Sequence, residues 1–236
     1  MPINDEVRFT WIGHGTWLAR SARGKQLLLD AWVTTNPVAP EHLKKIDSLD
    51  LMLITHGHGD HTADAVEIGK ATHAKLIGMP ETVGVLAGLG FPGSDNIGMN
   101  KGGTVDIDGI KITMVDARHS GGIEAGEQKA YGGDPAGYVI EFENGFTIYF
   151  AGDTDVFLDM KLFSELHRLD AAFLPIGGHY TMDPKRAAKA VELLGVKTVV
   201  PMHFATFPLL TGRPAQLQEL VGPGVKVLDI QPGAEV

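Results

Sequence analysis

Three histidines and one aspartate lie within six residues of one another in the segment 55–61, THGHGDH. Imidazole nitrogen and carboxylate oxygen are common protein ligands of divalent metal ions. Residues two apart in an extended loop point the same way, so His56 and His58 are expected to bind one ion, and Asp60 and His61 a second. The alternative, a set of solvated loop histidines, would require this density to arise by chance, at a probability of roughly 0.001. The segment therefore predicts a metal site.

Four ligands from one loop cannot complete two sites, and three residues elsewhere in the chain could supply the rest. His119, Asp153 and His203 each follow an apolar strand pattern, and the loops of a layered sheet gather along one edge. A lone histidine after a strand is more often a hydrogen-bonded surface or core residue, but the joint placement of the three favours ligation. Gly57 and Gly59 are expected to allow the tight backbone path of the first loop.

This pattern resembles that of the metallo-β-lactamase superfamily of binuclear metal hydrolases. The residues that match its ligand positions, in order, are His56, His58, Asp60 and His61 of the HxHxDH motif, then His119, Asp153 and His203. The resemblance implies a sandwich of two sheets between two layers of helices. It also implies a distribution of ligands: His56, His58 and His119 on one ion, Asp60, His61 and His203 on the other, and Asp153 between them.

Further stretches between about residues 7 and 210 resemble one branch of that superfamily, the small uncharacterised metal-dependent hydrolases similar to ascorbate-phosphate lactonase. They are GHGT at 13–16, MNKGG at 99–103, GDT at 152–154, PIGGHYTM at 175–182 and PMHF at 201–204. Asp30-Ala31 stands where the branch commonly has Asp-Pro, outside the ligand set. Because most members of this branch have no known substrate, the resemblance says more about fold and site than about the reaction.

The expected reaction is the hydrolysis of an ester, lactone or phosphodiester bond in a small cytoplasmic molecule. Two divalent ions about 3.5–4 Å apart can hold a bridging water and lower its pKa from about 15.7 to near neutrality, which gives a hydroxide nucleophile. The leaving group needs a proton, for which Asp60 or Asp153 is one source and His14 or His179 another. Either histidine could instead only support a ligand through a hydrogen bond. Asp30 is expected to bind a ligand imidazole or to cap a turn.

Zinc is the expected ion, with manganese or iron as alternatives, because all three accept ligands of nitrogen and oxygen and zinc has the higher affinity at equal availability. Two other classes of function stay open. In the first, the site holds two irons and does redox chemistry, although the chain carries no attached flavin domain. In the second, the protein is a metal-bound sensor or scaffold without turnover, although the complete ligand set argues against a decayed site.

The composition narrows the kinds of partner and chemistry. The chain has 236 residues, no cysteine and a net charge of −9, so disulfides, thiolate metal sites and a cysteine nucleophile are excluded. The negative charge disfavours nucleic acid as a partner. No apolar run reaches the length of about 18 residues that a membrane span needs, and the opening residues lack a secretory pattern. We therefore expect a cytoplasmic protein with a small-molecule substrate, and a homo-oligomer is compatible with the sequence.

The strand and helix patterns must bring these ligands together. Each half of the chain has a strand meander followed by strand–helix units, which predicts a single α/β domain over residues 1–236 with a four-layer αββα sandwich. The expected strands are 7–12, 16–20, 25–29, 51–54, 75–78, 104–107, 110–115, 138–142, 146–150, 171–175 and 198–202. The expected helices are 62–71, 80–88, 157–169, 183–194 and 214–220.

The glycine-rich segment 120–136 is longer than most loops in a compact domain. We interpret it as a lid or substrate wall, or as a mobile surface loop. Four aromatic residues could line an apolar pocket near the metals or pack in the core: Tyr131, Tyr180, Phe204 and Phe207. The remaining histidines are expected at the surface: His42, His73 and His167.

Overall fold

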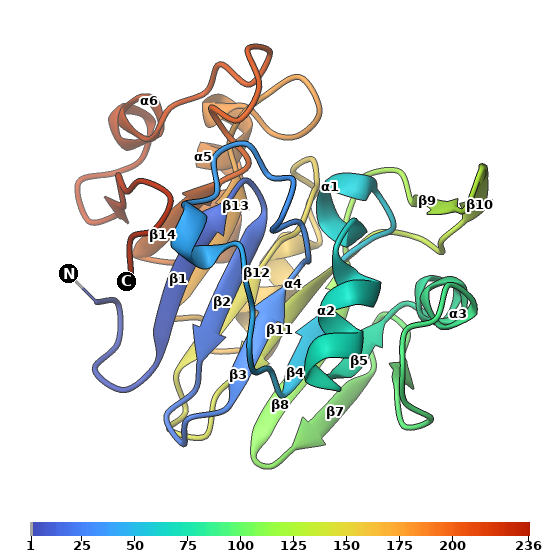
Figure 1. Cartoon of the computed structure of the whole chain (residues 1–236). Coiled ribbons are helices and arrows are strands. Elements are labelled where there is room, and N and C mark those ends of the chain that lie inside the picture. The colour runs from blue at the N-terminus through green and yellow to red at the C-terminus, as the bar shows by residue number, and fades with distance from the viewer. Residues whose placement is uncertain (1) are drawn as a thin grey trace.

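A computed structural model describes residues 2–236, and two large β-sheets form its centre (Figure 1). The first sheet has the order β1-β2-β3-β4-β5-β6. Its strands are Arg8–Gly13, Thr16–Arg20, Gln26–Leu29, Leu51–Leu53, Lys75–Gly78 and Ile97–Gly98. β1, β2 and β3 are antiparallel, and β3 to β6 are parallel.

The second sheet has the order β15-β14-β13-β12-β11-β8-β7. Its strands, in chain order, are β7 (Thr104–Ile107), β8 (Ile110–Asp116), β11 (Ala136–Glu141), β12 (Thr147–Phe150), β13 (Ala171–Pro175), β14 (Thr198–Met202) and β15 (Lys226–Val227). Pairing is antiparallel from β7 to β12 and parallel from β12 to β15. Each half of the chain thus has an antiparallel meander followed by parallel strands, as the sequence predicts.

Helices cover the outer faces of the two sheets, which confirms the predicted αββα order of layers. α2 (Ala65–Thr72) and α3 (Pro80–Gly88) lie on the first sheet, and α4 (Met160–Leu166), α5 (Pro184–Leu194) and α6 (Pro214–Leu220) on the second (Figure 1). α1 (Gly59–Thr62) is a single turn, and a short 3-10 turn spans Glu41–Leu43. None of the helices within residues 2–236 is long and apolar enough to cross a membrane.

Alternation along the first sheet explains the two apolar layers. Leu27 and Leu29 of β3 belong to the large cluster between the sheets, whereas Leu28 belongs to the cluster under α2 and α3. Successive side chains of a strand point to opposite faces, so one apolar strand contributes to both layers. This burial on both faces is why the sequence carries continuous apolar runs rather than alternating ones.

Two expected segments differ from the structure. The segment 120–136 contains a hairpin of β9 (Gly122–Ala125) and β10 (Gln128–Tyr131), which contacts α3, and is not an unstructured loop. The expected helix 157–169 is limited to α4, whose buried residues are Met160 and Phe163 rather than its leucines. Leu158 is 78% and Leu166 75% exposed, while Phe163 is buried. The short strands β6 and β15 have too few residues to give a sequence pattern.

Candidate metal site

The seven predicted ligands meet at one edge of the two sheets. His56 and His58 follow β4, and Asp60 and His61 lie in α1 directly after them. On the other sheet, His119 follows β8, Asp153 follows β12 and His203 follows β14. β8, β12 and β14 run in the same direction, so their carboxyl ends open at the same edge, opposite the loop that follows β4.

One group of donor atoms consists of His56, His58 and His119. One nitrogen from each ring lies within 4.8 Å of the other two, and His56 Nε2 is 3.0 Å from His58 Nδ1. His56 is buried, whereas His58 and His119 are half-buried and line a pocket. Three imidazoles at this spacing can hold one divalent ion.

A second group consists of Asp60, His61 and His203, and the structure adds His14 to it. Asp60 Oδ2 is 3.8 Å from His203 Nε2, 3.9 Å from His61 Nε2 and 3.0 Å from His14 Nε2. The donor atoms of all four residues lie within 4.8 Å of one another. The structure thus brings together the three residues that the resemblance assigns to one ion, with one additional imidazole beside them, and the binding of an ion by them stays a prediction.

The carboxylate of Asp153 faces both groups. Its Oδ2 is 3.5 Å from His119 Nε2 in the first group and 3.1 Å from His203 Nε2 in the second, and its Oδ1 is 3.4 Å from His61 Nε2. The Asp153 side chain is only 3% exposed. A buried carboxylate between two sets of imidazoles could contact an ion in each set.

Several of these atoms have no hydrogen-bond partner within the described part of the chain. His61 Nε2, His203 Nε2 and Asp153 Oδ1 are all buried and unpaired. Buried polar groups in folded proteins are nearly always satisfied, so unpaired atoms that converge on one space require an explanation. Divalent ions in that space would satisfy them, and the residues present therefore fit a metal site.

The electrostatics of the metal-free protein separate the two groups. Burial lowers the pKa values of His56, His58 and His119, so the first group favours neutral rings. Burial also opposes protonation of His203, but the Asp153 carboxylate outweighs it and raises the pKa to about 9. Asp153 likewise raises the pKa of His61 against the effect of burial. Without a metal, His61 and His203 of the second group therefore favour the protonated form.

Asp30 and Thr55 orient two of the ligand rings. His61 Nδ1 donates to Asp30 Oδ2 at 2.7 Å, which leaves His61 Nε2 to face the site. Thr55 donates its backbone N–H and its hydroxyl to Asp30, at 2.8 and 2.9 Å, so His56 Nδ1 donates to the Thr55 oxygen at 3.0 Å. Hydrogen bonds of this kind fix the tautomer and orientation of a metal ligand. The expected contact of Asp30 with a ligand imidazole is confirmed.

His14 is fully buried and connects two polar side chains. Its Nε2 donates to Asp60 Oδ2 at 3.0 Å, and its Nδ1 is 2.9 Å from the hydroxyl of Thr206. Burial first, and then the nearby His203, lower the pKa of His14 to about 4. His14 is therefore a neutral ring that holds one oxygen of Asp60.

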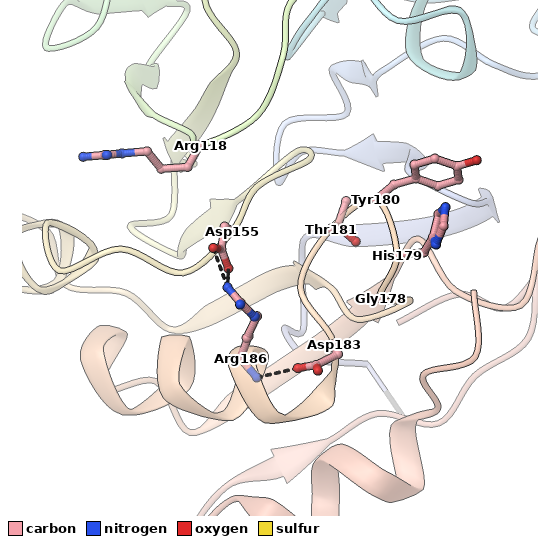
Figure 2. Close-up of a pocket in the computed structure, with 8 residues that line it drawn as sticks. All are labelled: Arg118, Asp155, Gly178, His179, Tyr180, Thr181, Asp183 and Arg186. Atoms are coloured by element: carbon pink, nitrogen blue, oxygen red, sulfur yellow. Dashed lines mark hydrogen bonds and ion pairs between the residues drawn. The ribbon is translucent and has the colours of Figure 1, made fainter. Parts of the chain in front are cut away.

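His179 lies apart from the donor groups. It is exposed and lines a polar pocket of about 340 Å³, where its ring contacts Tyr180 at a centroid distance of 4.4 Å. Figure 2 shows the two rings together on one side of this pocket, while Arg186 pairs with Asp155 further away. Tyr180 also lines the pocket in front of the metal ligands. A role for His179 in proton transfer stays a prediction.

The glycines of the first loop act differently from the expectation. Gly57 and Gly59 do not have positive φ angles. A Cβ on Gly57 would lie 2.5 Å from the Cβ of Ile123 in β9, so Gly57 lets the hairpin approach the ligand loop. Gly59 has open space around it. Gly15 has a role that the sequence did not indicate, because a Cβ there would lie 2.8 Å from Cε1 of His61.

The pocket in front of the ligands has a volume of about 580 Å³. It is lined by His58, Asp60, His119, Ser120, Asp153, Tyr180, His203, Phe207, Pro208 and Leu209. Of the four aromatic residues considered above, Tyr180 and Phe207 line it. Phe204 is buried against Trp11 at 5.2 Å, and Tyr131 is 65% exposed on β10.

The other histidines lie outside the donor groups. His42 and His73 are exposed and His167 is half-buried. No sequence pattern singles out Thr55, Thr206, Ser120 or Leu209, since hydroxyl and aliphatic side chains carry no metal-ligand pattern. Their positions next to predicted ligands, at 55, 120 and 204–210, are the only signal that could have found them.

Comparison with known proteins agrees with this fold and site. The beta-lactamase superfamily domain matches residues 25–204. A UPF0173 metal-dependent hydrolase of Koribacter versatilis (strain Ellin345) is 50% identical over 216 residues, which cover 91% of each chain. A UPF0173 metal-dependent hydrolase of Methanosarcina barkeri (strain Fusaro) is 42% identical over 232 residues, which cover 98% of each chain.

Among solved structures, Igni18, a metallo hydrolase from Ignicoccus hospitalis, superimposes with a TM-score of 0.85 at 36% identity, covering 98% of this chain and 97% of its own. An isothiocyanate hydrolase from Delia radicum gut bacteria shares the fold, with a TM-score of 0.74 at 19% identity. Fold and site together define a metallo-hydrolase of the beta-lactamase superfamily. Within that superfamily, the chain belongs to the UPF0173 metal-dependent hydrolases.

Proposed function

We propose that this hydrolase is binuclear and that it cleaves an ester, lactone or phosphodiester bond of a small molecule. The position of Asp153 carries the proposal, because its carboxylate lies within 3.1–3.5 Å of ring nitrogens from both donor groups. His56, His58 and His119 would hold one ion, Asp60, His61 and His203 the other, and Asp153 would contact both. Zinc suits these ligands, with manganese or iron as alternatives.

Two bound divalent ions supply an acidified water as nucleophile and positive charge for the oxygen on which negative charge develops. The leaving oxygen needs the proton that the attacking water gives up, and Asp60 is the carboxylate of the chain best placed to take that proton and pass it on. Its side chain is 30% exposed and lines the pocket, whereas that of Asp153 is 3% exposed. His14 holds Asp60 Oδ2 from the buried side. His14 is therefore a positioning residue for Asp60 in this proposal.

The proposal is tested by loading the protein separately with Zn²⁺, Mn²⁺ and Fe²⁺ and assaying lactones, esters, thioesters and phosphodiesters. We expect two ions per chain in the metal analysis and turnover well above that of Asp60→Ala. One ion per chain contradicts the binuclear site. If turnover does not exceed that of the Asp60→Ala control with any of the three metals, the result contradicts the proposed hydrolysis and favours a sensor or scaffold.

Substitutions test the roles proposed for His179 and His14 separately. His179→Ala is expected to lower kcat by about 10²-fold if His179 donates the proton. Unchanged turnover at full metal content would leave that role to Asp60.

His14→Gln is expected to lower kcat while metal content stays near two ions, because Gln retains a donor for Asp60 without the ring geometry. A variant with wild-type kcat contradicts the positioning role.

A further inference from the structure

The pocket in front of the metal ligands has an apolar wall, formed by Tyr180, Phe207, Pro208 and Leu209. Tyr180 is 53%, Phe207 36% and Leu209 52% exposed. Exposed apolar side chains that gather in a concave site, opposite polar groups, are typical of ligand-binding pockets. The metal ligands form the polar side, so a molecule in this pocket would have one polar end and one apolar end.

Contacts behind the wall hold it in place. Phe207 stacks on Trp32, with ring centroids 5.9 Å apart and planes at 27°, and its ring is 5.5 Å from that of His14. Leu210, the residue after the wall, is fully buried and donates its N–H to Phe207 O at 3.0 Å. The Phe207 part of the wall is therefore preformed and needs little ordering when a ligand binds.

The loop that carries Tyr180 is fixed to the loop that carries Phe207. Gly212 N donates to Gly177 O at 3.1 Å. A Cβ on Gly177 would lie 2.2 Å from His203 O, and one on Gly212 would lie 1.8 Å from Ile176 O. Both positions thus require glycine for this close approach, and the approach places Tyr180 and Leu209 on the same pocket.

The basic side chains around the pocket help to distinguish a phosphodiester from an ester or a lactone as the substrate. Among the described residues that line it there is neither lysine nor arginine. Arginine and lysine are the usual protein groups that bind phosphate. Arg118 and Arg186 line the neighbouring polar pocket instead, where Arg186 is already paired with Asp155 at 2.6 and 2.8 Å. Apart from the ions that the site would hold, the described lining residues therefore offer an anionic phosphodiester no lysine or arginine as a further partner.

We infer that the substrate is an uncharged lactone or carboxylic ester with an apolar substituent that packs on Tyr180, Phe207 and Leu209. This inference rests on the proposed hydrolase function and narrows its substrate class. In the reaction, the OH of water adds to the carbonyl carbon, the bond from that carbon to the ring or ester oxygen breaks, and the proton goes to the leaving oxygen. A lactone gives a hydroxy acid, and no oxidant or second substrate is consumed.

The inference is tested with zinc-loaded protein and a series of γ-lactones whose side chain grows from methyl to hexyl. Burial of each added methylene is expected to raise kcat/KM about fourfold. Leu209→Asp should lower kcat/KM for the hexyl lactone about tenfold or more, because the loss corresponds to one buried leucine, and should lower it by a smaller factor for the methyl lactone, whose substituent buries less apolar surface. Phe207→Ser provides a second variant. Leu158→Asp, at a 78% exposed leucine outside the pocket, is the matched control.

A binding measurement separates failure of the pocket from failure of the enzyme. N-phenyl-1-naphthylamine, an uncharged fluorescent probe, should bind zinc-loaded protein and lose affinity about tenfold in Leu209→Asp but not in Leu158→Asp. Equal binding by both variants, or a kcat/KM that does not depend on the length of the lactone's alkyl chain, contradicts the apolar pocket but not the proposed hydrolase function. Turnover of bis(p-nitrophenyl) phosphate above that of every lactone overturns the substrate class. No turnover above Asp60→Ala, with probe binding as expected, contradicts the proposed function itself.

Discussion

Thr55 links ligands of the two donor groups through one hydroxyl. It donates to Asp30, which accepts from His61, and it accepts from His56. Asp30 and Thr55 are both buried, and burial raises the pKa of Asp30 against the opposing effect of His61. Together, these hydrogen bonds help to keep the Asp30 carboxylate charged and the rings of His56 and His61 oriented.

Replacing Thr55 with valine tests this link. Valine has nearly the same shape, so the fold should persist, but Asp30 loses a donor and His56 loses the acceptor that fixes its tautomer. Loss of such a contact typically lowers metal affinity 10–100-fold. We expect that range for Thr55→Val in competition with a zinc chelator. Thr113→Val, at a hydroxyl that pairs with Thr104 on the surface, serves as control. Equal affinities of the two variants would refute the role of Thr55.

The second donor group makes the stability of the metal-free protein depend on pH. Asp153 raises the pKa of His203 to about 9 despite burial, above its ordinary value of about 6.5. Stability from this ion pair is therefore fully present below about pH 6.5 and is lost as the pH rises to about 9. Urea unfolding of chelator-treated protein should show this decline. The decline in the free energy of unfolding should be smaller in His203→Gln and as large as in the wild type in His42→Gln. A free energy of unfolding that stays constant between about pH 6.5 and 9 would refute the role of this ion pair.

The predictability of the site follows from the chemistry of its residues. His56, His58, Asp60 and His61 are recognisable because four ligand-type residues at this spacing are improbable by chance. Thr55 and Thr206 have common side chains whose function arises only from the three-dimensional arrangement. His14 shows a third case: its place after the first strand made it a candidate to support a ligand, but local spacing could not predict its 3.0 Å contact with Asp60, 46 positions away.

At the scale of elements, apolar runs define the buried strands well. β2, β5, β7, β13 and β14 have the bounds that the sequence predicts, and α5 begins where Asp183 accepts from Arg186 N. The hairpin of β9 and β10 was not predicted, because its residues are mostly polar or small and are ordered by packing on Gly57 and α3. Tertiary contacts of this type leave little pattern in the local sequence.

The contact between the loops after β13 and β14 is also a property of elements, and Gly212→Ala tests it. The added Cβ would lie 1.8 Å from a backbone oxygen, so one of the two loops must move. Overpacking of this kind costs about 1–3 kcal/mol, which urea unfolding of the zinc-loaded protein should reveal, together with a lower kcat/KM for the hexyl lactone. Gly222→Ala, in open space, is the matched control. Wild-type stability and kcat/KM in Gly212→Ala would show that the loops do not need this approach.

At the scale of the whole molecule, the ligands join the two sheets. His56, His58, Asp60 and His61 follow β4 of the first sheet, while His119, Asp153 and His203 follow strands of the second. Without a metal, several buried nitrogens and oxygens at this junction make no hydrogen bond, which is unfavourable for the folded state. Ions bound between the sheets would remove this cost and connect the two halves directly.

Metal binding should therefore stabilise the entire fold rather than only the loops. A ligand that binds the folded state alone adds about 4 kcal/mol when its free concentration is a thousandfold above Kd. We expect calorimetry to show one cooperative transition that shifts to higher temperature with Zn²⁺ and back on chelation. Asp153→Ala should lose most of the shift, because Asp153 faces both donor groups, whereas Asp47→Ala, a surface carboxylate beside Lys45, should keep it. A Zn²⁺-induced shift of equal size in Asp153→Ala would mean that the ions do not bind between the sheets.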